Sequence, residues 1–369
     1  MKKSWTARLK IWLPLLLMAF GFRYFLLLCT AWVRDMPFAQ LLWERLTEPG
    51  DAPRYLDIAL NGYVREGENA INLVFYPLYP LLIRGVSLLT GSLPLAGIAV
   101  SHVCYAGAVI GFYELLLLDR AEEQALFGTL LFILYPFSMF VLGVYSEGLF
   151  LLLSVFCLYA IRKRRFPAAG VLGMLAALTR VQGMLLLIPA LTEVLLARFG
   201  KEKRKPRVAD AAMGLIPVGF LVYLAINRHL YGNPFQFLVF EEGEPWYQTT
   251  KWLGTNLQTQ WGLIADSPQL AVIIYIPQIV LFFTALGALT FGLYRGEPLP
   301  MLAYGGAYLG FTYLSGWMIS GGRYMLCCMP FFASLSLIRG RGARFALLTV
   351  SALLFAVFNV AFLLGYAIM

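Results

Sequence analysis

The chain has 369 residues, of which 60% are hydrophobic and only 13% are charged, and its mean hydropathy is +0.73. One soluble core cannot bury that much apolar surface, so the composition excludes an ordinary globular enzyme and predicts a lipid environment. The formal net charge of +9 does not indicate nucleic acid, because the basic residues stand in short clusters between apolar runs.

Apolar runs of roughly 20 residues, enough for a helix to cross a hydrocarbon layer of about 30 Å, recur along the chain. Strand-period alternation is lacking, which excludes a membrane β-barrel. The sequence therefore predicts an all-α, polytopic membrane helix bundle of about eleven transmembrane helices, a single integral domain over residues 1–369. The expected spans are 11–32, 94–118, 124–141, 147–161, 167–180, 183–198, 208–227, 269–294, 299–317, 323–338 and 344–367.

The first apolar run follows MKKSWTARLK, a start that a secretory signal could also have. The run is too long for a signal, carries Arg23 and lacks a small-residue cleavage site, so we expect an uncleaved first span.

The basic clusters test the number of crossings, because they should share the cytoplasmic face. With the spans given above, all of them fall on one side. The pair 167–180 and 183–198 is the weakest step, since it could be one long broken helix. Two crossings are favoured because one crossing would put the KEKRKPR run outside. The clusters are Lys2, Lys3, Arg8 and Lys10, then 162–165, then 201–207, Arg295, and Arg339, Arg341 and Arg344.

Two long segments, 33–93 and 228–268, then fall on the external face. Segments of this length are more often functional than connective. The first opens with MPFAQLLWERLTE, whose apolar residues recur at helical spacing and predict a helix lying in the membrane interface.

The five cysteines lie in apolar runs without ligand spacing, and His102 and His229 are far apart in the chain. We therefore expect reduced packing cysteines, no metal site and no cofactor.

The first external segment holds two carboxylates, Asp51 and Asp57, just before an aromatic and proline-rich run. A carboxylate held near a membrane can act as a general base, because partial desolvation raises its pKa towards working pH. Asp51 stands just before the helix expected around Tyr55, so a helix cap is the competing interpretation, and spacing alone favours the cap.

Three more ionisable residues stand at the edges of expected spans. Glu147 begins one span, Arg180 lies between two apolar helices, and Arg323 follows two glycines. A buried arginine is costly without an anion, and guanidinium groups suit phosphate. Structural ion pairs with Asp51, Asp57 or Glu147 are the alternative for the arginines, and a helix-dipole contact is the alternative for Glu147.

Many aromatic residues are expected at the same face, where a membrane belt explains most of them. Some could instead stack on sugar rings. They are Tyr55, Tyr63, Phe75, Tyr76, Tyr79, Trp246, Tyr247, Trp252 and Trp261.

Six blocks in order resemble the PIG-V-like (second GPI mannosyltransferase) family and its bacterial relatives, within the type C glycosyltransferase superfamily. They are Asp51 with Tyr55, IALNGY, FYPLYPLLIR, YSEGLF, LTRVQG and GGRY, followed by Pro330. Each block is weak alone, and their order is fairly specific. The family usually has Trp before the aspartate and often His before the tyrosine, where this chain has Gly50 and Arg54.

The resemblance implies a type C glycosyltransferase-like fold and transfer of a hexose, typically mannose, from a polyprenyl-phosphate sugar to an acceptor hydroxyl on a glycolipid or glycan, with inversion. It implies Asp51 as the base. Arg180 and Arg323 are then candidates for the donor phosphate, with Arg54 and Arg84 in reserve. The candidate substrate-binding residues are Tyr55, Asp57, Tyr79, Tyr145, Glu147, Gln182 and Tyr324.

Two other classes remain open, namely a flippase or transporter of lipid-linked sugars and a non-catalytic membrane subunit. A transporter is expected to show internal repeats, and none is found. The long external segments contain no Asn-x-Ser/Thr acceptor site, which favours a bacterial cell membrane over an animal or fungal one.

Overall fold

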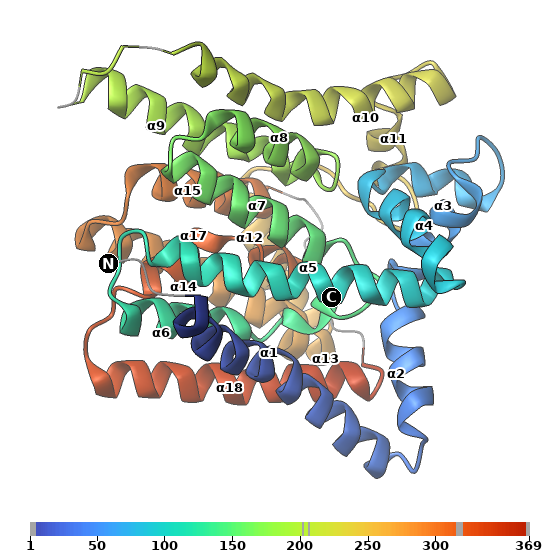
Figure 1. The fold of residues 1–369 in the computed structure, drawn as a ribbon. Helices are drawn as coiled ribbons and strands as arrows, with labels where there is room; N and C mark the ends of the chain where they lie inside the picture. The colour runs from blue at the N-terminus through green and yellow to red at the C-terminus, as the bar shows by residue number, and fades with distance from the viewer. Residues whose placement is uncertain (1–4, 201–202, 206, 315–319, 367–369) are drawn as a thin grey trace.

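The structure is a computed structural model that describes residues 5–200, 203–205, 207–314 and 320–366. Across these residues it contains helices and no strand (Figure 1). The α-helices are α1 (Trp5–Val33), α2 (Phe38–Thr47), α3 (Ala52–Asn61), α4 (Leu78–Thr90), α5 (Leu93–Leu116), α6 (Glu122–Ile133), α7 (Glu147–Arg162), α8 (Phe166–Ala177), α9 (Leu187–Phe199), α10 (Ile216–Tyr231), α11 (Gln236–Glu242), α12 (Leu253–Asp266), α13 (Pro268–Leu270), α14 (Ile276–Arg295), α15 (Leu299–Tyr313), α16 (Gly321–Met325), α17 (Met329–Leu335) and α18 (Arg341–Leu363).

Short helical turns extend several of these elements. They are η1 (Glu68–Val74), η2 (Ser138–Val141), η3 (Val181–Leu186), η4 (Val208–Leu215) and η5 (Ala271–Tyr275). Lys2, Lys3, part of the KEKRKPR run and the ends of the last and third-last expected spans lie outside the described residues.

The chain is a multi-pass membrane protein, and the predicted all-helical class is confirmed. Within the described ranges, six helical stretches are long and apolar enough to cross a membrane. The remaining expected spans hold shorter or interrupted helices, such as α6, α7 and α16 with α17, so eleven crossings stay a prediction. The six stretches are 5–33, 93–116, 181–199, 208–231, 268–295 and 341–363.

Residues 166–199 form two helices rather than one bent rod. α8 ends at Ala177, and the chain folds back so closely that a Cβ at Gly183 would lie 2.3 Å from the Ala177 nitrogen. Only glycine permits that approach, which explains the last residue of the LTRVQG block. The reversal places Arg180 at the tip of the hairpin.

Basic residues from separate links gather at one end of the bundle, which we call the basic end. Arg162 pairs with Asp119 at 2.8 Å and with Glu193 at 3.3 Å, and Arg120 pairs with Glu297. These pairs join the links after α5, α7 and α14 to the last turns of α9.

Arg8 pairs with Glu114 near the end of α5, and Arg344 pairs with Glu123 at the start of α6. Members of three predicted clusters therefore lie at the basic end, and the grouping of all the clusters on one side stays a prediction.

The opposite end, which we call the loop end, carries α2, α3, η1, α4 and α11, seen at the right of Figure 1. α2 buries Leu41 and Leu46 and leaves Phe38 and Trp43 exposed, as an interfacial helix requires. The chain bends by 109° between η1 and α4. The segment 34–93 is therefore a folded, helical region at the loop end of the bundle.

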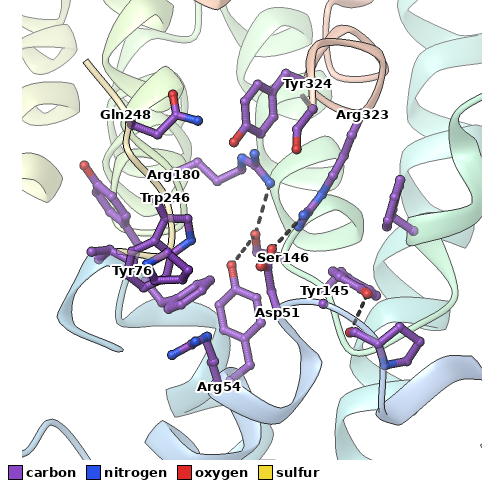
Figure 2. Close-up of a pocket in the computed structure, with 18 of the residues that line it drawn as sticks. Asp51, Arg54, Tyr76, Tyr145, Ser146, Arg180, Trp246, Gln248, Arg323 and Tyr324 are labelled. Atoms are coloured by element: carbon purple, nitrogen blue, oxygen red, sulfur yellow. Dashed lines mark hydrogen bonds and ion pairs between the residues drawn. The ribbon is translucent and has the colours of Figure 1, made fainter. Parts of the chain in front are cut away.

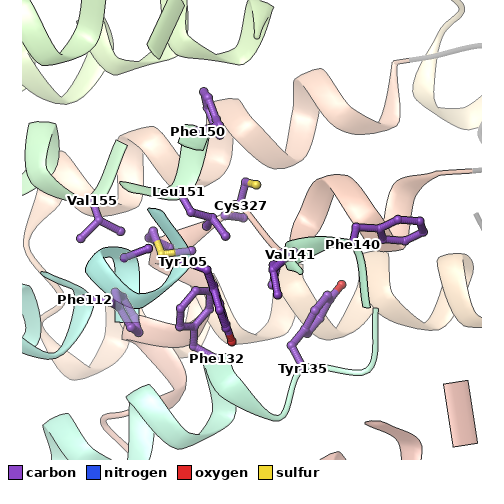
Figure 3. Packing of buried hydrophobic residues seen from close by; sticks show 14 of the residues in the cluster. Tyr105, Phe112, Phe132, Tyr135, Phe140, Val141, Phe150, Leu151, Val155 and Cys327 are labelled. Atoms are coloured by element: carbon purple, nitrogen blue, oxygen red, sulfur yellow. The ribbon is translucent and has the colours of Figure 1, made fainter. Parts of the chain in front are cut away.

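Aromatic and branched side chains fill the core between α5, α6, α7 and the C-terminal helices (Figure 3). Phe132 lies 5.4 Å from Phe112 and 5.5 Å from Phe332, both edge to face, which is a preferred aromatic geometry. This packing fixes α6 against α17, and so supports the neighbouring α16, which carries Arg323.

Candidate functional site

A cavity of about 570 Å³ opens at the loop end. Its walls come from segments far apart in the chain, namely the link before α3, the start of α7, the α8 to η3 turn, α16 and the loop after α11. Figure 2 shows Asp51 near its centre, with Tyr76, Trp246 and Gln248 on one side and Tyr145 on the other. The size is typical of a small-molecule site.

Asp51 occupies the N-cap position of α3, but its side chain makes no capping hydrogen bond. The carboxylate Oδ2 instead lies 2.6 Å from the Arg323 guanidinium, and its side chain is 25% exposed. The cap interpretation is therefore wrong for the side chain. Asp51 is a carboxylate that faces the cavity and is held by an arginine from the far end of the sequence.

Glu147 is fully buried in the first turn of α7 and joins the two arginines. Its Oε1 accepts a hydrogen bond from Arg180 at 2.6 Å and another from the Arg323 Nε. Its Oε2 has no hydrogen-bond partner among the described residues. The structural ion pairs left open by the sequence are therefore present, and two arginines with two carboxylates make a neutral cluster.

Aromatic rings hold the same guanidinium groups from the side. Arg323 lies 4.9 Å from the Phe140 ring and 4.8 Å from the Tyr145 ring, and Arg180 lies 5.1 Å from the Tyr324 ring. Such contacts favour a cation over an aromatic face. They keep both arginines in place at the cavity wall.

Arg54 is placed differently, because it pairs with no carboxylate among the described residues. It donates to the Asn72 Oδ1 at 3.0 Å and lies 5.1 Å from the Trp246 ring. Asn72 in turn donates to the Asp57 Oδ2 at 2.8 Å. Asp57 is therefore linked to Arg54 through Asn72, and Arg54 is a cation that no described carboxylate neutralises.

Gly50 explains why this chain departs from the usual residue before the aspartate. Its φ is +58°, and an added Cβ would lie 2.9 Å from the Tyr145 hydroxyl. That hydroxyl donates to the Pro49 carbonyl at 2.6 Å. The turn before Asp51 therefore needs a residue without a side chain.

Most predicted site residues meet in this cavity, and three do not. Gln182, Tyr55, Tyr145 and Tyr324 line it together with Asp51, Arg54, Arg180 and Arg323, and Glu147 lies directly behind the arginines. Tyr55 donates to the Ser146 Oγ at 2.9 Å, which ties α3 to the start of α7.

The other three lie elsewhere. Tyr79 is fully buried, and its hydroxyl is hydrogen-bonded to Ser101 of α5 at 2.7 Å. It therefore packs in the core and does not line the cavity. Asp57 lies outside the lining and bonds Asn61 and Asn72. Arg84 lines a separate groove between α4 and α10.

Sequence reasoning missed Asn72, Glu241 and Gln248, and it left Tyr76 and Trp246 among the belt aromatics. All but Asn72 line the cavity. No local sequence pattern marks Glu241. Its place in the cavity wall depends on how α11 packs against the first segment, from which α5 to α10 separate it in the sequence. The dense Trp, Tyr and Gln content of 228–268 was the available signal.

The fold and cavity define a helical membrane protein with a charged, aromatic-lined site at one end. A sequence model of the mannosyltransferase (PIG-V) family matches residues 35–242, which is more than half of the chain. The chain belongs to this family. The match includes Asp51, Glu147 and Arg180 and ends before Arg323 is reached.

Curated relatives agree over a shorter stretch. The mouse GPI alpha-1,6-mannosyltransferase 2 is 32% identical over 148 residues, which cover 36% of this chain and 29% of that protein. The rat protein of the same name gives the same identity and coverage. The aligned part is therefore under a third of these relatives' length.

Among solved structures, the crystal structure of ArnT from Cupriavidus metallidurans bound to undecaprenyl phosphate has a TM-score of 0.55. The match covers 85% of this chain and 60% of that one, at 13% identity. At that identity the likeness concerns the fold alone, and it confirms the predicted type C glycosyltransferase-like architecture.

Proposed function

We propose that this chain is a membrane glycosyltransferase that moves a hexose, in the first instance mannose, from a polyprenyl-phosphate donor to a hydroxyl group of a glycolipid or glycan. Family membership supports the mannosyl transfer, and the undecaprenyl phosphate bound to ArnT supports a polyprenyl phosphate as the kind of lipid to test. The observation that carries the proposal is Asp51, a cavity carboxylate held 2.6 Å from Arg323.

In the proposed reaction Asp51 acts as the general base. It takes the proton from the acceptor hydroxyl while that oxygen bonds to the anomeric carbon of the donor sugar. The bond from this carbon to the phosphate oxygen breaks, so the configuration inverts and polyprenyl phosphate leaves. No metal or cofactor is needed to balance these steps.

The arginines can stabilise the negative charge that develops on the leaving phosphate. Before transfer, Arg180 and Arg323 are balanced by Glu147 and Asp51. Protonation of Asp51 removes one negative charge, so the cluster becomes positive in the same step in which the leaving phosphate gains negative charge. Arg54, stacked on Trp246 and unbalanced by any described carboxylate, is the first candidate to bind the donor phosphate at rest.

We place the reaction at the external face of a bacterial cell membrane. Support comes from Arg8, Arg162 and Arg344, members of clusters that the positive-inside rule assigns to the cytoplasm, which lie at the basic end, whereas the cavity lies at the loop end.

The test is a transfer assay with purified protein in detergent, where transport has no meaning. Radiolabelled polyprenyl-phosphate mannose is incubated with membrane glycolipid, and labelled product is separated by chromatography. We expect Asp51→Asn to lower turnover by about 10² to 10⁴-fold, the range of general base catalysis. Arg323 keeps its pairing with Glu147, so the thermal unfolding should change little.

Glu48→Gln is the matched control, since Glu48 is exposed just outside the cavity. It should leave turnover unchanged. Wild-type rates in Asp51→Asn would remove Asp51 from the mechanism, and absence of labelled product with every donor and acceptor tested would favour the transporter or the non-catalytic subunit.

A further inference from the structure

The loop after α11 forms one wall of the cavity and is anchored to the first segment. Gln248 donates its backbone N–H to the Glu241 carbonyl at 2.7 Å, which closes the loop. The Trp246 ring then lies 6.0 Å from the Phe75 ring, edge to face. These contacts hold the loop after α11 in place against the first segment.

Glu241 is a cavity-lining carboxyl that no described cation pairs with. Burial raises its pKa to about 7. The other two carboxylates of the site, Asp51 and Glu147, both contact arginine. Glu241 is thus the acidic group of the site whose side chain no described cation neutralises.

Tyr76 provides a second unused polar group on the same wall. Its ring stacks on Tyr223 at 4.0 Å, and its hydroxyl is buried with no hydrogen-bond partner among the described residues. Burial, and next the charge of the nearby Glu241, raise the pKa of Tyr76. The two groups are therefore close enough to sense each other.

Buried polar groups are nearly always partnered, so the unpartnered Tyr76 hydroxyl, in the same cavity wall as a carboxyl that no described cation neutralises, indicates a missing ligand. A carboxyl can accept hydrogen bonds from hydroxyl groups, and a phenol can donate or accept one. An ionised Glu241 carboxylate repels an anion, so its neighbourhood suits a neutral hydroxyl group, while Arg54, stacked on Trp246, stays the candidate for the phosphate. Trp246 adds an apolar ring that suits the face of a sugar.

We propose that Glu241 and Tyr76 form a subsite that binds hydroxyl groups of a neutral hexose, across the cavity from Tyr145. The inference rests on the proposed function only for the identity of that hexose, which is either the donor's sugar or the acceptor's terminal sugar. Glu241 is a substrate-binding residue, and Asp51 remains the base.

The experiment measures binding without any transfer. Methyl α-D-mannopyranoside is titrated into the purified protein in lipid nanodiscs, and saturation-transfer NMR reports the Kd. We expect Glu241→Gln to weaken binding by about tenfold and Tyr76→Phe by a few-fold, because each removes one hydrogen-bonding group with little change of shape.

Glu242→Gln is the matched control, since Glu242 is the exposed neighbour on the same helix. It should bind the mannoside as the wild type does. Equal Kd values for wild type and Glu241→Gln, or no binding to the wild type, would overturn the proposal. Monodeoxy mannosides separate lost binding from a folding defect. The analogue that lacks the hydroxyl bound by Glu241 should bind wild type and Glu241→Gln with the same Kd, whereas the other analogues should bind Glu241→Gln more weakly.

The transfer assay then separates the two sources of the hexose. A raised KM for the acceptor in Glu241→Gln assigns the subsite to the acceptor, and a raised KM for the donor assigns it to the donor. Unchanged values for both would contradict the subsite. Mannoside binding without any transfer would defeat the proposed function and leave the subsite intact.

Discussion

Single residues of this site are defined by partners that lie far away in the sequence. Asp51 looks like a helix cap by position, yet its carboxylate faces Arg323, which is 272 residues later (323 − 51). Glu147 resembles a residue that favours a helix dipole, yet it bridges two arginines. Local patterns report the residue type and the helix end, whereas the ion pairs depend on how the bundle closes.

Glu147→Gln tests the bridge between the two arginines. Removing its charge leaves Arg180 and part of Arg323 buried without compensation, which typically costs about 3 to 5 kcal/mol of the free energy of unfolding. We expect a lower thermal midpoint and a loss of turnover in protein that is still folded at low temperature.

Glu193→Gln is the matched variant, because Glu193 also contacts two arginines, Arg162 and Arg164, at the basic end. It should destabilise the protein less, since Arg164 is more exposed, and should keep the turnover of the folded fraction. Equal turnover losses in the two variants would assign Glu147 to stability alone.

The titration of Glu241 gives a pH prediction. Because burial raises its pKa to about 7, the carboxyl is mostly neutral at pH 6 and mostly ionised at pH 8. The ionised form accepts stronger hydrogen bonds, so mannoside affinity should rise several-fold across that range. The Kd measured at pH 6, 7 and 8 checks this.

The effect of Glu241 on the pH profile must be distinguished from that of its neighbours. Tyr76, Tyr223 and Tyr324 face it from the first segment, α10 and α16. Burial raises the pKa of Tyr76, so its phenol stays neutral over this range. His229, at the end of α10, lines the separate groove between α4 and α10 and serves as the comparison position. The profile should flatten in Glu241→Gln and persist in His229→Gln, and the reverse result would exclude Glu241.

At the scale of elements, the helices of the loop end were readable from sequence. The apolar spacing of MPFAQLLWERLTE predicts α2, and the residues after Asp51 predict α3. The structure adds the sharp bend between η1 and α4 and the packing of η1 against α11. These depend on side-chain packing between segments, which periodicity does not record.

The turn between α2 and α3 is set by Gly50. An alanine there would adopt a left-handed conformation at a cost of about 1 to 2 kcal/mol and would press on the Tyr145 hydroxyl. We expect Gly50→Ala to lower both the thermal midpoint and turnover, because the turn carries Asp51.

Gly62→Ala separates these two effects. Gly62 has a similar φ of +74°, and nothing lies within 4 Å of an added Cβ. It should cost stability through the backbone alone and leave turnover of the folded protein near the wild-type value. Matching turnover losses in both variants would show that the contact with Tyr145 is unimportant.

For the whole molecule, composition already requires a helical membrane bundle, and the ordered blocks indicate the family. The number of crossings was harder to derive, since α6, α7, α8 and α17 are shorter than a full span. Neighbouring helices can satisfy the backbone polar groups at the ends of a short helix inside the membrane. A hydropathy window therefore detects such a helix but does not show whether it crosses the bilayer.

Sidedness is the prediction that the whole arrangement makes. If the loop end is external, a membrane-impermeant maleimide should label Glu66→Cys in intact cells and label Lys205→Cys only after permeabilisation. Both positions are exposed, and they lie in the segment after α3 and in the link between α9 and α10. Cys29→Ser provides the background, because Cys29 is the exposed cysteine of the five. Labelling of residue 66 only after permeabilisation would place Asp51 on the cytoplasmic side, where the positive-inside argument for the site could not hold.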